Sequence, residues 1–151
     1  MGGLVGIFNG GSITNSAAFG DLTGTGMDLG GLIGYIYAGA ATNNYAHGNA
    51  ETVTSLSGQK VGGLVGSNQS TVSLSYAIGS AEAGASEGGL LGTNSSGATC
   101  QDSYWDTNTS ELTDAIGYDV GASSNLVGLS TWQIKGGAAQ SNMTSLGLSL
   151  I

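Results

Sequence analysis

The clearest pattern along the chain is a strict alternation of side chains between positions 72 and 78. Val72, Leu74, Tyr76 and Ile78 alternate with Ser73, Ser75 and Ala77. A period of two is typical of a β-strand with one buried face, so we predict a strand here. The same register predicts inward-facing side chains in two earlier segments: Ile13, Ala17 and Phe19 in the first, and Ala41, Tyr45 and His47 in the second.

A glycine pentapeptide precedes each alternating segment. Gly-Gly-Leu-apolar-Gly occurs at residues 2–6, 30–34, 62–66 and 88–92, at spacings of 28, 32 and 26 residues. A second element follows at a nearly constant offset, namely Ser-Ala-Ala-Phe-Gly at 16–20, Asn-Tyr-Ala-His-Gly at 44–48, Ser-Tyr-Ala-Ile-Gly at 75–79 and Ser-Tyr-Trp-Asp at 103–106. Self-similarity at such a period indicates a repeat architecture.

Each repeat predicts three short strands. They are a pentapeptide strand, the alternating strand, and a third strand around Leu22, Ala50 to Val53 and Ala81 to Ala83. A unit of this size fits one coil of a β-solenoid, in which coils stacked about 4.8 Å apart pair every strand with its neighbours. We therefore predict an all-β, β-helix-like solenoid of about four coils over residues 1–106. One file of leucines should run through it: Leu4, Leu32, Leu64 and Leu90.

The repeat stops after Asp106, and residues 107–151 predict a capping tail within the same domain. A solenoid needs an end that covers its last open coil. In this tail Ser130 or Thr131 is expected to cap a short helical turn. The longest spacing predicts a loose outward loop from Thr52 to Gln59.

These motifs resemble the GLUG repeats of large bacterial surface and secreted proteins, including filamentous-haemagglutinin-like adhesins. The resemblance lies in Gly-Gly-Leu-Val-Gly followed by Ser-Tyr-Ala-x-Gly. Residues 103–107 and 128–134 are similar to the segment that often closes such arrays. The first unit departs from the pattern, because Ala17 stands where tyrosine is usual. The resemblance implies a bacterial surface or secreted protein, and it carries no catalytic residues over to this chain.

Composition excludes several classes of protein. The chain has two Lys+Arg residues, both lysine, and a net charge of -8, so a nucleic-acid partner is not expected. No stretch of about 18 apolar residues occurs, so we expect no membrane insertion. Glycine makes up 29 of the 151 residues and proline is absent, which suits close-packed coils held by main-chain hydrogen bonds. The one cysteine, Cys100, is expected to be a small buried apolar residue.

Candidate chemistry is sparse. Residues 84–88 match the nucleophile-elbow pattern around Ser86, and Ser57 to Lys60 match S-x-x-K, but neither has its expected context. His47 is the only histidine, and packing or a surface edge explains it better than catalysis. The best enzymatic alternative is a polysaccharide-acting pair of carboxylates, and calcium bound by aspartates is a weaker one. The carboxylates considered are Glu82, Glu87, Asp102 and Asp106 for the pair, and Asp102, Asp106, Asp114 and Asp119 for calcium.

We therefore expect a non-catalytic structural or adhesive module, with no catalytic, cofactor or metal site. Met1 is followed directly by Gly2 and Gly3 with no basic segment, so the chain is either cytosolic or an excised fragment, and the repeat that starts at once favours a fragment. The resemblance to GLUG repeats implies that the fragment comes from an extracellular or cell-surface protein and lacks its signal peptide. The expected partners are a host glycan or surface protein, and a second copy joined end to end through the open coil at Gly2 to Gly6. A glycan-binding module would present an exposed aromatic cluster, with Tyr35, Tyr37 and Tyr45 as candidates. An ice-binding solenoid is disfavoured because the threonine columns are irregular.

Overall fold

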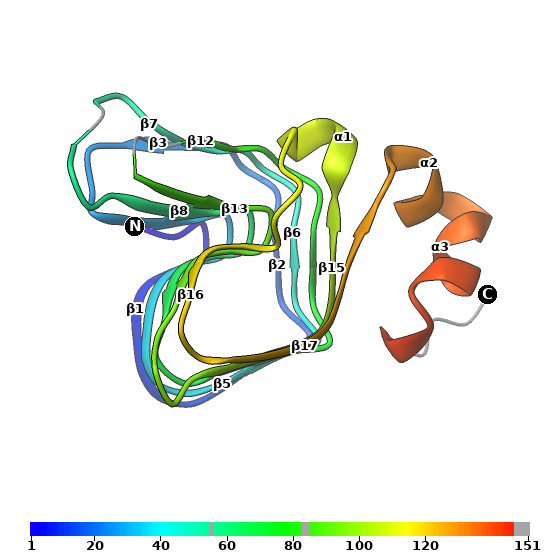
Figure 1. Cartoon of the computed structure of the whole chain (residues 1–151), viewed down its shortest axis with the longest axis horizontal. Coiled ribbons are helices and arrows are strands. Elements are labelled where there is room, and N and C mark those ends of the chain that lie inside the picture. Colours follow the sequence, from blue (N-terminus) through cyan, green and yellow to red (C-terminus); the bar gives the residue numbers. More distant parts are fainter. Residues whose placement is uncertain (55, 83–84, 147–151) are drawn as a thin grey trace.

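The chain folds into a β-solenoid of about four turns (Figure 1). The computed structural model describes residues 1–54, 56–82 and 85–146. Strands of successive coils pair in parallel and form one large sheet and two three-stranded sheets. The predicted all-β solenoid is therefore confirmed.

Three walls enclose the main core of the solenoid. The first wall contains β1 (Val5–Thr14), β5 (Ile33–Thr42), β9 (Val65–Asn68), β14 (Leu91–Asn94) and β16 (Ile116–Asp119). The second contains the ends of β1 and β5 with β10 (Thr71–Ser73), β15 (Thr99–Asp106) and β17 (Ala122–Leu129). The third contains β2 (Ala17–Ala18), β6 (Tyr45–Ala46) and β11 (Tyr76–Ala77), with the end of β15 beside β11.

Two further sheets form a narrow arm beside this core (Figure 1). One contains β3 (Leu22–Gly24), β7 (Ala50–Thr52) and β12 (Ala81–Glu82). The other contains β4 (Asp28–Gly30), β8 (Lys60–Gly62) and β13 (Ser86–Gly88). The predicted third strand is thus present in each repeat, although Ala83 lies outside the described residues. Leu29, Ala50, Val61 and Ala81 form a separate small apolar cluster in the arm.

The predicted leucine file is confirmed by the main-chain hydrogen bonds between coils. The Leu4 amide donates to the Leu32 carbonyl at 2.9 Å, and Leu32 and Leu64 repeat this bond to Leu64 and Leu90, each at 2.9 Å. The side chains of Leu32, Leu64 and Leu90 are fully buried in the main apolar cluster. The four pentapeptides are therefore successive rungs of one ladder.

The pentapeptide forms a corner, and our prediction of a single strand there was wrong. The arm strands end at Gly30, Gly62 and Gly88, and the first-wall strands begin three residues later. Two chain segments meet closely at this corner. A Cβ placed on Gly62 would lie 2.0 Å from the Val65 carbonyl oxygen, and one on Gly63 would lie 2.4 Å from that of Gly89. Only glycine fits there, which explains why the motif repeats.

A second corner divides the predicted alternating strand. Five stacked residues between the second and third walls have left-handed backbone: Asn15 (φ 52°), Asn43 (φ 57°), Leu74 (φ 50°), Asp102 (φ 51°) and Asn125 (φ 50°). This turn shifts the inward register by one residue, so alanines of the third wall point inward: Ala18, Ala46 and Ala77. Ile13, Ala41 and Val72, before the corner, pack in the core as predicted. Ala17, Phe19 and His47 are exposed, which corrects their predicted inward placement.

Buried amide side chains form a hydrogen-bonded ladder inside the solenoid. Asn68 and Asn94 are fully buried at equivalent positions of β9 and β14. The Asn68 amide donates to Asn94 Oδ1 at 2.9 Å, and the Asn94 amide donates to Asp119 Oδ1 at 3.0 Å. The Asn68 amide also donates to the Thr99 carbonyl at 3.1 Å. These bonds tie the first wall to the second where larger apolar side chains are absent.

The tail covers the fourth coil with strands and then turns onto the third wall. β16 pairs with β14 and β17 with β15, so the coiled structure continues past the repeat boundary at Asp106. Short helices α1 (Thr107–Ser110), α2 (Thr131–Ile134) and α3 (Gly136–Asn142) and a 3-10 turn (Thr144–Leu146) complete it. Ser130 caps α2 in a capping box with Gln133, as predicted. The predicted outward loop connects β7 to β8, and its Val53 and Leu56 are exposed.

The glycine requirement can be tested at one pentapeptide position in two coils. A Cβ on Gly66 would lie 2.5 Å from the Gly34 carbonyl oxygen and 2.6 Å from the Leu29 amide nitrogen, whereas nothing lies within 4 Å of one on Gly6. We expect Gly66→Ala to lower the free energy of unfolding by about 3 kcal/mol, at the upper end of overpacking costs. Gly6→Ala should change it by less than about 0.5 kcal/mol. Urea denaturation measures both, and equal effects would contradict the close-approach argument.

Leu74 is a position at which a substitution should stabilise the folded protein. It adopts left-handed backbone without the short polar side chain found at the equivalent positions 15, 43, 102 and 125. The Asn43 amide donates to Asn15 Oδ1, and the Asn125 amide donates to Asp102 Oδ1 at 2.7 Å, so Leu74 interrupts a polar column. We expect Leu74→Asn to raise stability by about 1 kcal/mol, because asparagine tolerates this conformation. A lower melting temperature for Leu74→Asn would show that apolar contacts of Leu74 outweigh its strain.

Candidate binding surface

Aromatic side chains form a strip on the outer face of the third wall. Tyr45 and Tyr76 occupy the same position of β6 and β11, and their rings stack with centroids 4.3 Å apart and an interplanar angle of 21°. The Phe19 ring meets Tyr45 edge-on at 5.5 Å, and His47 lies 6.0 Å from Phe19. We call Phe19, Tyr45, His47 and Tyr76 the aromatic strip. Phe19 is 66% exposed, so the strip presents an apolar ring to solvent.

The strip exists because of the corner described above. The one-residue shift turns the alanines inward, where the coils approach closely, and turns their larger neighbours outward. A Cβ on Gly31 or Gly63 would lie 3.1 Å from the Cβ of Ala46 or Ala77, so the glycine corner packs closely against these alanines. The alternating register assigned Phe19 and Tyr76 to the interior, and a surface edge was only one of two explanations given for His47. The available signal was the Asn or Asp that precedes most of these segments, since both residues tolerate left-handed backbone.

The helical tail covers the other half of the same wall. Ile78 and Tyr104 continue the strip toward the C-terminal coils, but they are buried in a cluster with Leu129, Ile134 and Met143. The Ser145 amide donates to the Tyr104 hydroxyl at 3.2 Å, and the Thr109 hydroxyl donates to the Ile78 carbonyl at 2.7 Å. The exposed aromatic strip is therefore confined to the first three repeats.

Partial burial raises the pKa values of the two phenols in the strip above the ordinary value of 10.0. Desolvation, followed by the neighbouring Tyr76, raises the pKa of Tyr45 to about 12. Desolvation also raises the pKa of Tyr76. Both hydroxyls are therefore uncharged donors and acceptors at neutral pH, and the rings are apolar platforms.

The predicted tyrosine cluster is only partly assembled. Tyr35 and Tyr37 lie on β5 with ring centroids 6.4 Å apart, and Tyr37 is 58% exposed. Tyr45 belongs to β6 and packs with Phe19, His47 and Tyr76. Two aromatic surfaces therefore replace the single predicted cluster, and the one around Tyr45 contains more rings in contact.

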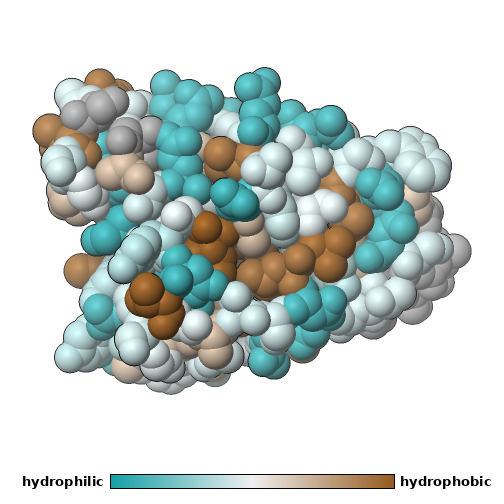
Figure 2. All heavy atoms as spheres, viewed as in Figure 1, coloured by the Kyte–Doolittle hydropathy of each residue, from teal (hydrophilic) through white to brown (hydrophobic). Residues whose placement is uncertain are grey.

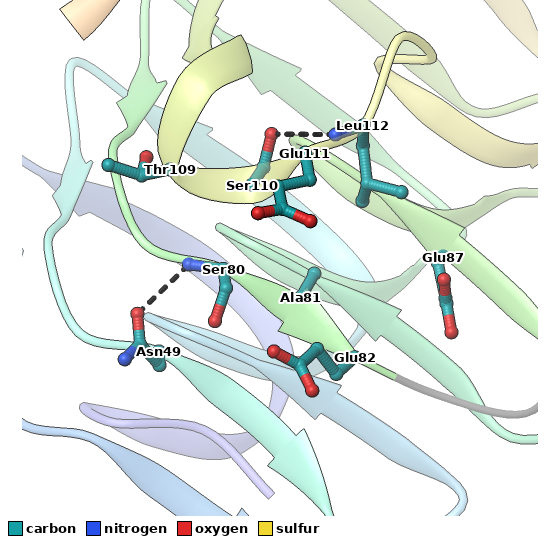
Figure 3. A pocket seen from close by; sticks show the side chains of 9 residues that line it. All are labelled: Asn49, Ser80, Ala81, Glu82, Glu87, Thr109, Ser110, Glu111 and Leu112. Carbon is teal, nitrogen blue, oxygen red and sulfur yellow. Dashed lines mark hydrogen bonds between the residues drawn. The ribbon is translucent and has the colours of Figure 1, made fainter.

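An acidic cavity of about 660 Å³ lies where the arm meets α1 (Figure 3). Three carboxylates line it: Glu82, Glu87 and Glu111. The sequence singled out Glu82 and Glu87, which the structure brings together, but it gave no reason to include Glu111. The close-up shows hydrogen bonds between Ser80 and Asn49 and between Leu112 and Ser110 at its margin.

Asp102 and Asp106, the other two carboxylates considered for a catalytic pair, have structural roles elsewhere. Asp102 occupies a left-handed corner and accepts a hydrogen bond from Asn125. Asp106 is the N-cap of α1. Its Oδ1 accepts hydrogen bonds from the main-chain amide of Asn108 at 2.9 Å and from the Thr131 hydroxyl at 2.9 Å. Neither residue lines the acidic cavity. The four carboxylates therefore do not form one site.

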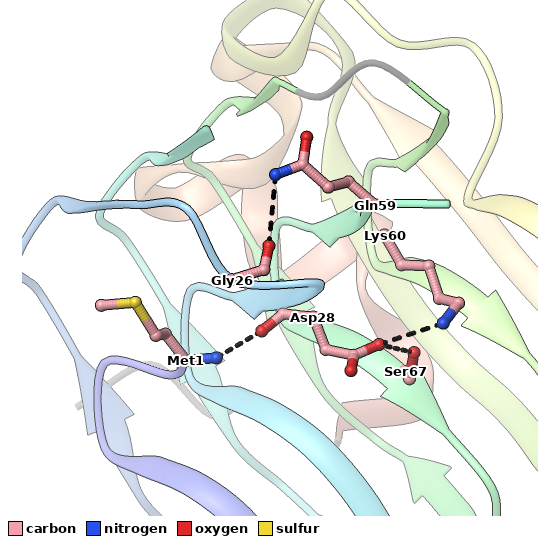
Figure 4. A network of polar contacts seen from close by, with 6 residues as sticks. All are labelled: Met1, Gly26, Asp28, Gln59, Lys60 and Ser67. Carbon is pink, nitrogen blue, oxygen red and sulfur yellow. Dashed lines mark hydrogen bonds and ion pairs between the residues drawn. The ribbon is translucent and has the colours of Figure 1, made fainter. Parts of the chain in front are cut away.

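Lys60 and Asp28 anchor the arm to the first wall (Figure 4). Lys60 Nζ lies 3.4 Å from Asp28 Oδ1, which also accepts a hydrogen bond from the Ser67 hydroxyl of β9. Gln59 is fully buried and donates to the Gly26 carbonyl at 3.3 Å. Lys60, the lysine of the S-x-x-K match, thus serves an ion pair between coils. Ser86 of the other serine motif lies in β13, and Gly84 of that motif lies outside the described residues.

The described residues contain no group of three or more His, Cys, Asp or Glu side chains placed to hold a metal ion. The four aspartates considered for calcium are therefore not gathered into a ligand set within residues 1–54, 56–82 and 85–146. No helix in that part of the chain has the length and apolar character to cross a bilayer.

Comparison with known proteins finds no match: no family model, curated protein or solved structure matches this chain. The resemblance to GLUG repeats accordingly stays a prediction from the motifs.

Buried ionisable groups predict a loss of stability at alkaline pH. Cys100 is buried in the core as expected, and desolvation followed by Asp119 raises its pKa from 9.0 to about 12. Between these values the unfolded chain has lost the thiol proton and the folded chain has kept it. The stability that this thiol contributes is therefore fully present below pH 9 and falls as pH rises toward 12, by at most about 1.4 kcal/mol per pH unit. The raised tyrosine pKa values add a second fall that begins near pH 10.

Urea unfolding between pH 8 and 11 tests this expectation. Cys100→Ala should remove the part of the slope that begins near pH 9 and leave the part due to the tyrosines. An unchanged slope in Cys100→Ala would contradict the assignment to the buried thiol.

Proposed function

We propose that this chain is a non-catalytic structural and adhesive module of a bacterial cell-surface or secreted protein, and that its aromatic strip binds a neutral glycan. Two lines of support are independent. The repeat motifs resemble those of adhesin-like surface proteins, which implies the setting. The solenoid holds its side chains at regular coil spacing, which suits a stalk that carries a binding wall.

The aromatic strip is the observation that carries the proposal. Exposed aromatic rings supply large apolar contact area at low entropic cost, and their hydroxyl groups supply hydrogen bonds. Here one exposed phenylalanine packs against a stacked tyrosine pair on a rigid sheet. The net charge of -8 repels acidic polysaccharides and protein surfaces rich in carboxylates. An uncharged sugar chain is therefore the favoured ligand class.

Binding to an array of neutral glycans tests this function. Phe19→Ala should lower affinity for the bound glycan at least about fivefold, because truncating a central interface aromatic costs more than about 1 kcal/mol. Tyr37→Ala is the matched control, since Tyr37 is also exposed but lies on β5. Equal loss in both variants, or no loss in Phe19→Ala, would contradict the role of the strip.

The acidic cavity supports the alternative, a polysaccharide-acting β-helix domain. It brings Glu82 and Glu87 to one hollow with Glu111, as a carboxylate mechanism requires. The same glycans incubated with the wild-type chain distinguish the two readings. Release of reducing ends that disappears in Glu87→Gln would favour the enzyme, whereas binding without release favours the adhesive module.

A further inference from the structure

The last coil of the solenoid ends in an open, partly apolar face. β16 and β17 each pair with one strand, and no described residue forms a strand on their other side. Ile116 and Leu126 pack against the main core but are only half-buried, whereas Leu91 and Ser103, their partners in the previous coil, are fully buried. The helices that follow pack beside the third wall instead of over this face. We call the β16–β17 edge with Ala115, Ile116 and Leu126 the C-terminal face.

The first coil presents a second open face. β1 pairs with β5 alone among the described strands. Leu4 is 50% exposed although its stacked equivalents Leu32 and Leu64 are completely buried. Val5 is half-buried and contacts the core cluster. We call the β1 edge with Leu4 and Val5 the N-terminal face. Figure 2 looks along the stack at the opposite end, which carries β16 and β17 in the foreground of Figure 1, and shows a band of apolar residues across that end.

The polarity of the main-chain hydrogen bonds makes these two faces complementary. At the pentapeptide corner each amide donates toward the C-terminal coils, from Leu4 to Leu32, from Leu64 to Leu90, and from Leu90 to the Ala115 carbonyl. The Leu4 carbonyl therefore faces outward at one end and the Ala115 amide at the other. On the third wall the amides donate the other way, from Tyr45 to the Ser16 carbonyl and from Tyr104 to the Ser75 carbonyl. When the C-terminal face of one copy meets the N-terminal face of another, donors and acceptors keep the order that they have between coils.

The side-chain columns continue in the same arrangement. Val5, Ile33, Val65, Leu91 and Ile116 form one apolar column by register. A second copy that adds its first coil to the C-terminal face extends this column with Val5 beside Ile116. The contact repeats the coil-to-coil interface that already occurs throughout the chain.

We propose that the C-terminal face binds the N-terminal face of a second copy, so that the chain stacks end to end into a continuous solenoid. The interface is heterologous, because two different faces meet, and it therefore propagates instead of closing as a symmetric dimer. It is separate from the aromatic strip on the third wall. Added salt should strengthen stacking, because it screens the repulsion between copies that each carry a net charge of -8.

Sedimentation of two charged variants tests the proposal. Leu4→Lys and Ile116→Lys each place a cation in one face, and each should weaken self-association about tenfold or more relative to the wild type. Tyr37→Lys is the control, because it adds the same charge at an exposed side chain of β5, outside both faces, and should associate as the wild type does. Circular dichroism checks that each variant is folded, and Leu126→Lys replaces Ile116→Lys if that variant is not.

An equimolar mixture of the two variants gives the decisive result. Leu4→Lys keeps an intact C-terminal face and Ile116→Lys keeps an intact N-terminal face, so the mixture should form dimers that grow no further. A mixture that stays monomeric, or a wild type that remains monomeric at about millimolar concentration, would overturn the proposal. Because glycan binding is measured on the monomeric variants as well, failure of stacking and failure of the adhesive function are distinguishable.

Discussion

The close stacking of main chains at the glycine corner is the constraint on which the rest of this structure depends. Each pentapeptide brings two segments of its own coil, and the carbonyl of the next coil, within the space that a Cβ would occupy. Every coil can then donate a hydrogen bond to the next at the same point. Because this pairing satisfies the backbone without bulky side chains, a chain with few large apolar residues still forms an ordered interior.

The close stacking of coils also explains why polar side chains are buried inside the solenoid. In the first three coils the inward positions of the third wall hold alanine, and only the fourth coil places a large side chain there, Trp105, so this wall contributes little apolar volume to most of the core. Asn68 and Asn94 are fully buried, and their side-chain amides donate hydrogen bonds both to the next coil and to the second wall. At the second corner the buried Ser75 also links two coils, because its hydroxyl accepts a hydrogen bond from the main-chain amide of Asn44 at 3.0 Å. Repeated polar residues thus take the place of a thicker core.

The sequence was sufficient to predict the architecture, because repeat period and glycine spacing depend on main-chain stacking. The leucine file and the third strand were found this way, whereas the cap at Ser130 or Thr131 was predicted from the residue types that begin helices. The side of the third wall that faces solvent could not be read from alternation, since a left-handed residue inside the pattern shifts the register. Leu74 conceals that corner most effectively, because leucine rarely adopts this conformation.

The aromatic strip and the acidic cavity could not be predicted from the alternation of apolar and polar residues. The unbroken register assigned Phe19, Tyr45 and His47 to the interior, and only Tyr45 was also named as a candidate surface aromatic. Glu111 lines the acidic cavity only because α1 folds back over the arm, and α1 is held there by the buried N-cap Asp106. Contacts between coils recur at the same position of each repeat, so they can be predicted from the repeat period. The tail does not repeat, so its contacts cannot be predicted in this way.

The tail also determines which parts of the solenoid are available to partners. By packing on Tyr104 and Ile78 it removes the C-terminal half of the third wall from solvent, and it leaves the aromatic strip of the earlier coils exposed. Because it lies beside the wall, it leaves the edge of β16 and β17 without a strand neighbour among the described residues. Lateral binding and end-to-end stacking can therefore proceed on the same chain without competing for surface. A stacked array would repeat the aromatic strip along one side, so weak single contacts with a long sugar chain would combine into strong attachment.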